Sequence, residues 1–268
     1  MIKRILNKIG ISKNYPLVVN GQKFSVPIRK GIGFTHFADS EPWMDEILKK
    51  LGQPKSNFLD VGVNIGQTLL KWKALFPDSN YVGFEPNQNC VAYVENLIAL
   101  NTIKKCELQP YGLATEKTST KLFLLGTDKG DSSATTIENF REGEKRTAIE
   151  IKTIPLKHIK NNVFDLIKID VEGAELGVLE SVFEVNNSAL IICEILPVYS
   201  KNNTERLGRQ KAIESLLVKN EYLIYRIIKD LPVQLHQLSS FDIHGDLAKS
   251  DYVFIPKKQE KEIIARFK

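Results

Sequence analysis

The chain has 268 residues, of which 43% are hydrophobic and 26% are charged, as in an ordinary globular protein. The net charge of +5 is spread along the chain rather than gathered in blocks, which argues against a nucleic-acid partner. No apolar run reaches the roughly 18 residues of a membrane-spanning helix, so a single α/β domain without a transmembrane segment is expected.

The first fifth of the chain predicts a small N-terminal cap segment, residues 1–52. Residues 1–11 interleave basic and apolar side chains, which predicts a helix docked on its own domain or, alternatively, one in peripheral contact with a membrane surface. Residues 15–28 predict one or two short strands around the turn Asn20-Gly21. A helix then starts with Ser40 as its N-cap and ends at Gly52. Its predicted core face carries Trp43, Met44, Ile47, Leu48 and Leu51.

The stretch from Phe58 to Gln67 organises the main domain, residues 53–268. An apolar run breaks at Gly62, and apolar residues then recur at helical spacing, which predicts a strand, a tight turn and a helix N-terminus. Glycine lets backbone approach a ligand closely, and the free N–H groups of a helix start favour an electron-rich ligand. In an open α/β sheet, nucleotides bind at such a junction.

The spacing of the glycines argues against two common nucleotide motifs. A dinucleotide fingerprint, G-x-G-x-x-G, needs glycine where this chain has Asn64 and Gln67. A phosphate-binding loop needs a lysine followed by serine or threonine, which Gln67-Thr68 does not supply. What remains is Asp60-x-Gly62-x-Asn64-x-Gly66, and the acid at the strand end suits a ligand that carries a cation.

A second strand ends in an acid, Glu85, followed by Pro86. Glu85 follows Asp60 by 25 residues, close to the ~20 expected for a carboxylate that takes ribose hydroxyls. A helix begins near Asn87, and the next strand, Cys106 to Gly112, has its exit at Tyr111-Gly112-Leu113. An insertion near residues 115–156 follows: strands at Thr120 to Leu125 and Ile149 to Leu156 flank a polar stretch, 126–146, which is either a lid or a mobile surface loop.

Two further strands place acids on the same rim. Phe164 to Asp170 has the apolar interior of a buried central parallel strand, so Asp170 lies at its carboxyl end, and Glu172 comes two residues later. The strand Leu190 to Leu196 likewise carries Glu194 at its exit. A helix at 204–218, strands at Tyr222 to Ile228 and Tyr252 to Ile255, and a charged, helical tail complete the chain.

Three segments together resemble a known family. Asp60-Val61-Gly62-Val63-Asn64-Ile65-Gly66, Phe84-Glu85-Pro86-Asn87 and Lys168-Ile169-Asp170-Val171-Glu172-Gly173-Ala174-Glu175 are similar to motifs of the FkbM family of S-adenosyl-L-methionine (SAM)-dependent methyltransferases. The resemblance covers roughly residues 30 to 200. It implies a Rossmann-like class I SAM methyltransferase fold, a mostly parallel seven-stranded sheet with helices on both faces and the last strand antiparallel.

The resemblance also implies a donor site. Asp60 would lie near the methionine part of SAM, directly or through water, and Glu85 would take both ribose hydroxyls. The turn after the first strand would form the floor, and the exit of the third strand would flank the adenine. The implied SAM-binding residues are Asp60, Gly62, Asn64, Ile65, Gly66, Glu85, Pro86, Tyr111, Gly112 and Leu113.

The resemblance further implies O-methyl transfer to a hydroxyl of a sugar, a glycan or a small metabolite. The alternatives are an N- or carboxyl-methyltransferase and a non-catalytic SAM-binding subunit. A hydroxyl acceptor calls for a base, for which Asp170, Glu172 and Glu194 are the candidates. We favour Asp170, whose rival role is to hold the donor's ammonium group. No metal is assigned, although carboxylates at these strand ends could approach one point.

The remaining reactive residues carry weaker signals. Cys90, Cys106 and Cys193 have no metal-binding spacing and predict reduced, mostly buried thiols in a cytoplasmic protein. In the resembled family the segment before the first strand covers the cofactor. His36 and Trp43 are therefore either ordinary packing residues or part of the acceptor side.

Overall fold

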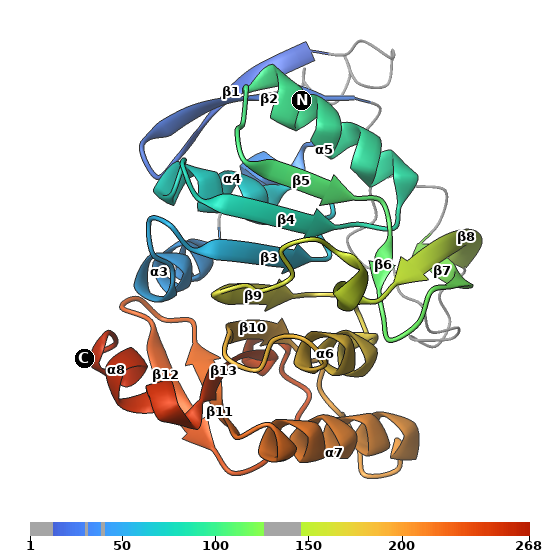
Figure 1. Ribbon diagram of the computed structural model, residues 1–268, viewed down its shortest axis with the longest axis vertical. Helices are drawn as coiled ribbons and strands as arrows, with labels where there is room; N and C mark the ends of the chain where they lie inside the picture. Colours follow the sequence, from blue (N-terminus) through green and yellow to red (C-terminus); the bar gives the residue numbers. More distant parts are fainter. Residues whose placement is uncertain (1–12, 30–31, 39–40, 126–145) are drawn as a thin grey trace.

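The computed structural model describes residues 13–29, 32–38, 41–125 and 146–268 (Figure 1). Residues 1–11, and nearly all of the 126–146 stretch, lie outside the described residues, so the membrane contact and the lid stay predictions. The described part of the chain forms a central sheet with a small hairpin at one edge and a second hairpin beyond the strand ends (Figure 1).

Within the described residues, the central sheet has eight strands in the order β12-β11-β13-β10-β9-β3-β4-β5. Neighbours from β10 to β5 are parallel, and β13 runs antiparallel to both of its neighbours. The predicted mostly parallel sheet is confirmed, but its strand number is eight, because β12 adds an edge strand. The strands are β3 (Asn57–Val61), β4 (Asn80–Phe84), β5 (Cys106–Gln109), β9 (Leu166–Ile169), β10 (Leu190–Glu194), β11 (Tyr222–Ile228), β12 (Gln234–Leu238) and β13 (Asp251–Pro256).

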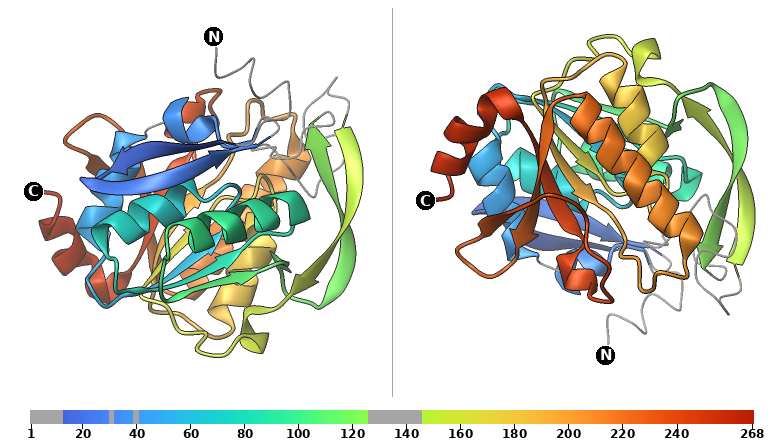
Figure 2. Two further views of the ribbon diagram at one scale, coloured as in Figure 1. Left: turned by 90° about the horizontal axis from the view of Figure 1, so that it is seen from above. Right: turned by 90° about the horizontal axis from the view of Figure 1, so that it is seen from below.

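Helices cover both faces of this sheet (Figure 2), as predicted. One face packs against α3, α4, α5 and α8, and the other packs against α6 and α7. The helices are α2 (Thr35–Ala38), α3 (Pro42–Leu51), α4 (Gln67–Leu75), α5 (Gln88–Leu100), α6 (Glu175–Phe183), α7 (Thr204–Lys219) and α8 (Glu260–Ala265), with 3-10 turns at Leu156–His158, Leu247–Lys249 and Lys257–Gln259.

The described part of the cap segment is built as the sequence predicts. Strands β1 (Lys13–Val19) and β2 (Gln22–Ile28) pair around Asn20-Gly21, both of which have positive φ. Helix α3 buries all five predicted core residues, but it begins at Pro42 and its N-cap is Glu41, which has left-handed φ and makes no side-chain cap. The predicted Ser40 N-cap is therefore wrong, because the helix starts one residue later. Because Val26, Ile47 and Leu48 belong to the same core cluster as the sheet, the cap and the main domain share one core.

The predicted strand Cys106 to Gly112 is wrong in its second half. Strand β5 ends at Gln109, and β6 (Gly112–Leu113) pairs with β8 in a separate three-stranded sheet. Pro110, between them, has no N–H for a ladder, so the chain leaves the central sheet there. That second sheet is completed by the hairpin of β7 (Thr118–Leu125) and β8 (Arg146–Ile154), which stands beyond the arrowheads of the parallel strands (Figure 1).

Candidate active site

Two cavities lie side by side at the carboxyl ends of the parallel strands. The larger has a volume of about 400 Å³, within the roughly 300–1,000 Å³ typical of ligand pockets, and the smaller has about 240 Å³. Gly62, Asn64 and Asp170 line both of them, so the two spaces meet at these residues. A ligand in one cavity can therefore reach a group in the other at this shared wall.

The glycine turn after β3 forms part of the shared wall. The N–H groups of Gly62 and Val63 both donate to the Phe84 carbonyl oxygen, at 3.0 and 3.2 Å, which ties the turn to the end of β4. Gly62 has a φ of +89°, and a Cβ there would overlap the Asp170 carbonyl oxygen. Both the backbone conformation and the close approach of the β9 exit therefore require glycine at this position.

Glu85 lies at the side of the larger cavity and is held by backbone donors. Its two carboxylate oxygens accept from the N–H groups of Asn64, at 2.7 Å, and Asn87, at 2.8 Å. Burial raises the pKa of Glu85 to about 7, although the two N–H donors pull it down. Each oxygen has further acceptor capacity, so a pair of ligand hydroxyls can still be bound.

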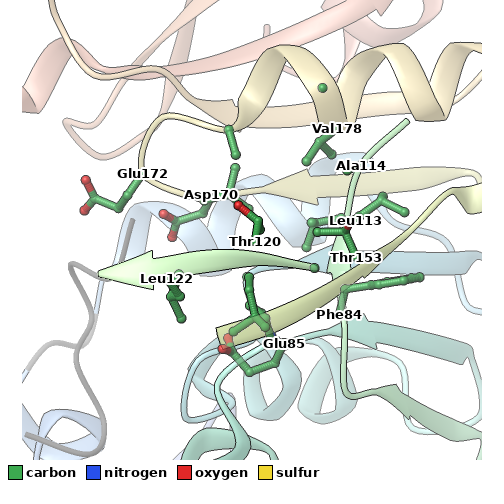
Figure 3. A pocket seen from close by; sticks show the side chains of 18 of the residues that line it. Phe84, Glu85, Leu113, Ala114, Thr120, Leu122, Thr153, Asp170, Glu172 and Val178 are labelled. Carbon is green, nitrogen blue, oxygen red and sulfur yellow. The ribbon is translucent and has the colours of Figure 1, made fainter. Parts of the chain in front are cut away.

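The opposite wall of the larger cavity comes from β6 and the β7–β8 hairpin. Gly112, Leu113 and Ala114 line it, whereas Tyr111 does not and instead packs against the core. Figure 3 shows Thr120, Leu122 and Thr153 of the hairpin beside Asp170 and Glu85 of the sheet. Sequence reasoning missed these hairpin residues; their signal was the period-two spacing that puts Thr118, Thr120 and Leu122 on one strand face.

Asp60 lies beneath the site rather than in it. Its side chain is fully buried, lines neither cavity, accepts from the Tyr81 hydroxyl at 2.7 Å and pairs with Lys168 at 3.4 Å. Lys168 also pairs with Asp170 at 3.2 Å. Burial alone would lower the pKa of Lys168, but the carboxylates of Asp60 and Asp170 raise it well above its usual range. Asp60 thus lies outside both cavities and supports Asp170 through an ion-pair chain, and its predicted place near the methionine part of the donor, directly or through water, stays a prediction.

Three carboxyl groups form a row across neighbouring strands. Asp170 follows β9, Glu194 ends β10, and Asp251 starts β13 directly opposite Glu194 in the antiparallel register. Burial, and then the negative charges of Asp170 and Asp251, raise the pKa of Glu194 well above its usual range. Burial and charge repulsion therefore favour the protonated form of Glu194, whose carboxyl group is hydrogen-bonded to that of Asp170. All three residues line the smaller cavity.

Two residues outside these three strands complete the smaller cavity. The ammonium group of Lys229, just after β11, lies 2.5 Å from an Asp251 oxygen and 4.5 Å from the centre of the Trp43 ring. Trp43, one of the two residues with an open role, therefore lines a cavity. The other, His36, is buried, with its ring Nε2 3.1 Å from the Ile65 carbonyl oxygen, and burial lowers its pKa to about 4. His36 is therefore a neutral packing residue.

The structure brings most of the predicted site residues together. Those on the larger cavity are Gly62, Asn64, Glu85, Pro86, Gly112, Leu113, Asp170 and Glu172, and Glu194 lines the smaller one. Asp60, Tyr111, Ile65 and Gly66 line neither cavity. Gly66 has instead a structural role, as the left-handed residue before α4.

The described residues also bear on the expectations for metal binding, cysteine chemistry and membrane spans. Among them, no three histidine, cysteine, aspartate or glutamate side chains are placed to share a metal ion. Cys90 and Cys193 are buried, Cys106 is half-buried, and all three are free thiols, as predicted. None of the helices in the described ranges is both long and apolar enough to cross a membrane.

The strand order, the glycine turn after β3 and the acid after β4 define a class I SAM-dependent methyltransferase fold. Residues 60–224, more than half of the chain, match the family described as the Methyltransferase FkbM domain. The chain belongs to this family, which confirms the sequence resemblance.

Solved structures with a related fold come from diverse methyltransferases. An O-methyltransferase from Bacillus cereus in complex with SAH (S-adenosylhomocysteine) is 10% identical, with 80% of this chain and 78% of that chain covered and a TM-score of 0.47. An SAH-bound methyltransferase from Podospora anserina is 11% identical, with 81% and 77% covered and a TM-score of 0.44. A ribosomal protein L11 methylase from Lactobacillus delbrueckii subsp. bulgaricus is 13% identical, with 82% and 80% covered and a TM-score of 0.44. Such low similarity carries no information on the acceptor. A comparison with curated protein sequences finds no match.

Proposed function

We propose that this protein is a SAM-dependent O-methyltransferase that binds its donor in the larger cavity and transfers the methyl group at the shared wall. The observation that carries this proposal is the position of Asp170, the one residue with an ionisable side chain among the described residues that line both cavities. Its side chain is 39% exposed, so a ligand in either space can contact it.

The residues of the larger cavity fit the donor. Glu85 has two oxygens with remaining acceptor capacity for the ribose diol, and the backbone N–H of Asn64 holds its carboxyl group in place. Leu113 and Val178 offer an apolar surface for a planar base, and the glycine turn admits close backbone approach. When bound, SAM would supply a methyl group on an electrophilic sulfonium centre.

The shared wall would align the acceptor and accept its proton. As the acceptor oxygen attacks the methyl carbon, a C–O bond forms, the carbon–sulfur bond breaks, and its electron pair stays on sulfur. The hydroxyl proton passes to the Asp170 carboxylate. Much of the catalysis is then alignment at near-attack distance, with proton transfer contributing roughly 10²–10⁴-fold.

The neighbours of Asp170 support its assignment as the base over the other candidates. Burial and its acidic neighbours favour the protonated form of Glu194, which makes it a poorer base than Asp170, so it would orient Asp170. Glu172, on the loop after β9, lines only the larger cavity and would face the donor rather than the acceptor. The cap segment, 1–52, would cover the smaller cavity through Trp43, and the main domain, 53–268, would bind the donor.

The test is Asp170→Asn, a substitution of nearly equal shape. With a radiolabelled methyl donor and a panel of hydroxyl compounds, turnover should fall by roughly 10²–10⁴-fold while SAH affinity is retained. A loss of SAH affinity, with affinity for 5′-methylthioadenosine unchanged, would assign Asp170 to the donor's ammonium group instead. Turnover equal to that of the wild type would refute Asp170 as the base. A wild-type protein that binds SAH, turns over no acceptor and binds a partner tightly would be a non-catalytic subunit.

A further inference from the structure

One wall of the smaller cavity is made of residues that have no part in the proposed donor binding. It reaches from the shared residues to Trp43 on α3, Asp251 on β13 and Lys229 after β11, three segments far apart in the sequence. Trp43 is 7% exposed and Asp251 is 8% exposed, so both are built into the wall rather than lying on the surface. No sequence motif or family match assigns a role to Lys229 or Asp251.

Both lysines that line this cavity are already paired with carboxylates. Lys168 is held between Asp60 and Asp170, and Lys229 is held by Asp251 at 2.5 Å. Burial raises the pKa of Asp251 to about 6, with Lys229 opposing the shift, so Asp251 is ionised above neutral pH. Among the described residues that line the smaller cavity, no lysine or arginine is left to neutralise an anionic ligand.

The same wall is rich in groups that bind hydroxyls. Carboxyl side chains of Glu41, Asp170, Glu194 and Asp251 line the cavity. Ionised carboxylates accept hydrogen bonds from ligand O–H groups, and a protonated carboxyl donates to a ligand oxygen. A phosphate or carboxylate on the ligand would face these groups with no free cation from the described lining, and like charges at close range are costly.

We propose that the smaller cavity is the acceptor site and that it selects an uncharged, hydroxyl-bearing acceptor over an anionic one. Asp251 causes this selection because it keeps the Lys229 ammonium group paired beside Trp43. The inference rests on the proposed function, since it needs the methyl donor in the neighbouring cavity. Asp251 and Lys229 are specificity-determining residues in this account, and the acceptor oxygen reaches Asp170 across the shared wall.

The chain provides its own reporter for this site. It has two tryptophans: Trp43 lines the smaller cavity, and Trp72 is fully buried, stacked on Phe58 at 4.3 Å. With 5-fluorotryptophan incorporated, fluorine NMR of the SAH-saturated protein at pH 8 gives two signals, which a Trp43→Phe variant assigns. Trp72 serves as the internal control. The probes are methyl glucoside, which is uncharged, and glucuronate, which is its anionic counterpart.

Methyl glucoside should shift the Trp43 signal and leave the Trp72 signal in place, and glucuronate should bind at least about tenfold more weakly. Asp251→Asn leaves Lys229 without its carboxylate, so this variant should gain glucuronate binding. The double variant Asp251→Asn/Lys229→Met should lose that gain. Lys201→Met, at an exposed position, is the control for lysine removal.

The outcomes separate this inference from the proposed function. If the folded protein does not bind SAH in a prior titration, the proposed function is refuted, and the acceptor-site proposal that depends on it is refuted as well. If SAH binds but methyl glucoside leaves the Trp43 signal unmoved, the acceptor assignment alone is overturned. Equal binding of both probes to the wild type, or no gain of glucuronate binding in a folded Asp251→Asn protein, overturns the selection by charge.

Discussion

The larger and the smaller cavity differ in how they are built. The larger one is lined by the Gly62 turn, the β4 exit at Glu85, the β6 segment and a hairpin face of threonine and aliphatic side chains. The smaller one is shaped by charged side chains that meet from the cap, the sheet and the β11–β12 connection. The larger cavity therefore offers apolar surface beside the carboxyl group of Glu85, whereas the smaller cavity offers charged groups that bind hydroxyls.

The ion pairs beneath the two cavities join them. Lys168 is 6% exposed and touches Asp60 on one side and Asp170 on the other. A buried charge that loses its partner is strongly destabilising, whereas loss of both partners often costs little. Substitution of Lys168 is therefore the first way to test how the two cavities are connected.

Lys168→Met should have the largest effect on stability. It leaves the fully buried Asp60 without its cation, and we expect the free energy of unfolding to fall by about 3–5 kcal/mol in chemical denaturation. The double variant Asp60→Asn/Lys168→Met should recover most of that loss. A single variant as stable as the wild type would contradict the proposed support for Asp170.

Gly62→Ala should come next, and it acts on the shared wall. The positive φ and the overlap of a Cβ with the Asp170 carbonyl oxygen should lower the free energy of unfolding by roughly 2–4 kcal/mol and weaken SAH binding. Gly208→Ala is the matched control, because it lies within α7 with open space around its Cα. It should instead stabilise the protein by about 0.5–1 kcal/mol. Equal effects of the two substitutions would show that the wall does not constrain Gly62.

A change of pH should have a smaller effect, on SAH affinity, through Glu85 in the larger cavity. Because burial raises the pKa of Glu85 to about 7, this carboxyl is mostly ionised at pH 8 and about nine-tenths protonated at pH 6. If the ionised form takes the ribose hydroxyls, SAH affinity should rise with pH and be about tenfold weaker at pH 6 than at pH 8. In Glu85→Gln the pH dependence should disappear. A wild-type affinity that is flat between these two pH values would argue against this role.

The sequence predicts the sheet side of the larger cavity because the parts of that side are local. The turn Asp60 to Gly66 and the acid Glu85 are each encoded within a few residues of a strand end, and the sheet brings strand ends together. Helical periodicity likewise predicts the buried face of α3. The sequence does not predict how deeply a side chain is buried. The motif around Asp60 resembles a ligand contact, but its side chain points into the core and contacts Tyr81 and Lys168.

The smaller cavity and two strand details escape prediction for physical reasons. Trp43, Lys229 and Asp251 lie in three distant segments, so no spacing in the sequence brings them together. Strand β12 is a half-exposed edge strand whose Leu235 and Leu238 are three residues apart, which hides the period of two. The break after β5 depends on Pro110, whose missing N–H matters only once the neighbouring strand is known.

The most direct test of the account is a calorimetric titration of the intact protein with SAM and SAH at pH 8, repeated on Glu85→Ala. We expect micromolar binding of both compounds to the wild type and loss of most of that affinity in a folded variant, because Glu85 would hold the ribose hydroxyls in the larger cavity. Failure of the folded wild-type protein to bind either compound, or equal binding by Glu85→Ala, would contradict it.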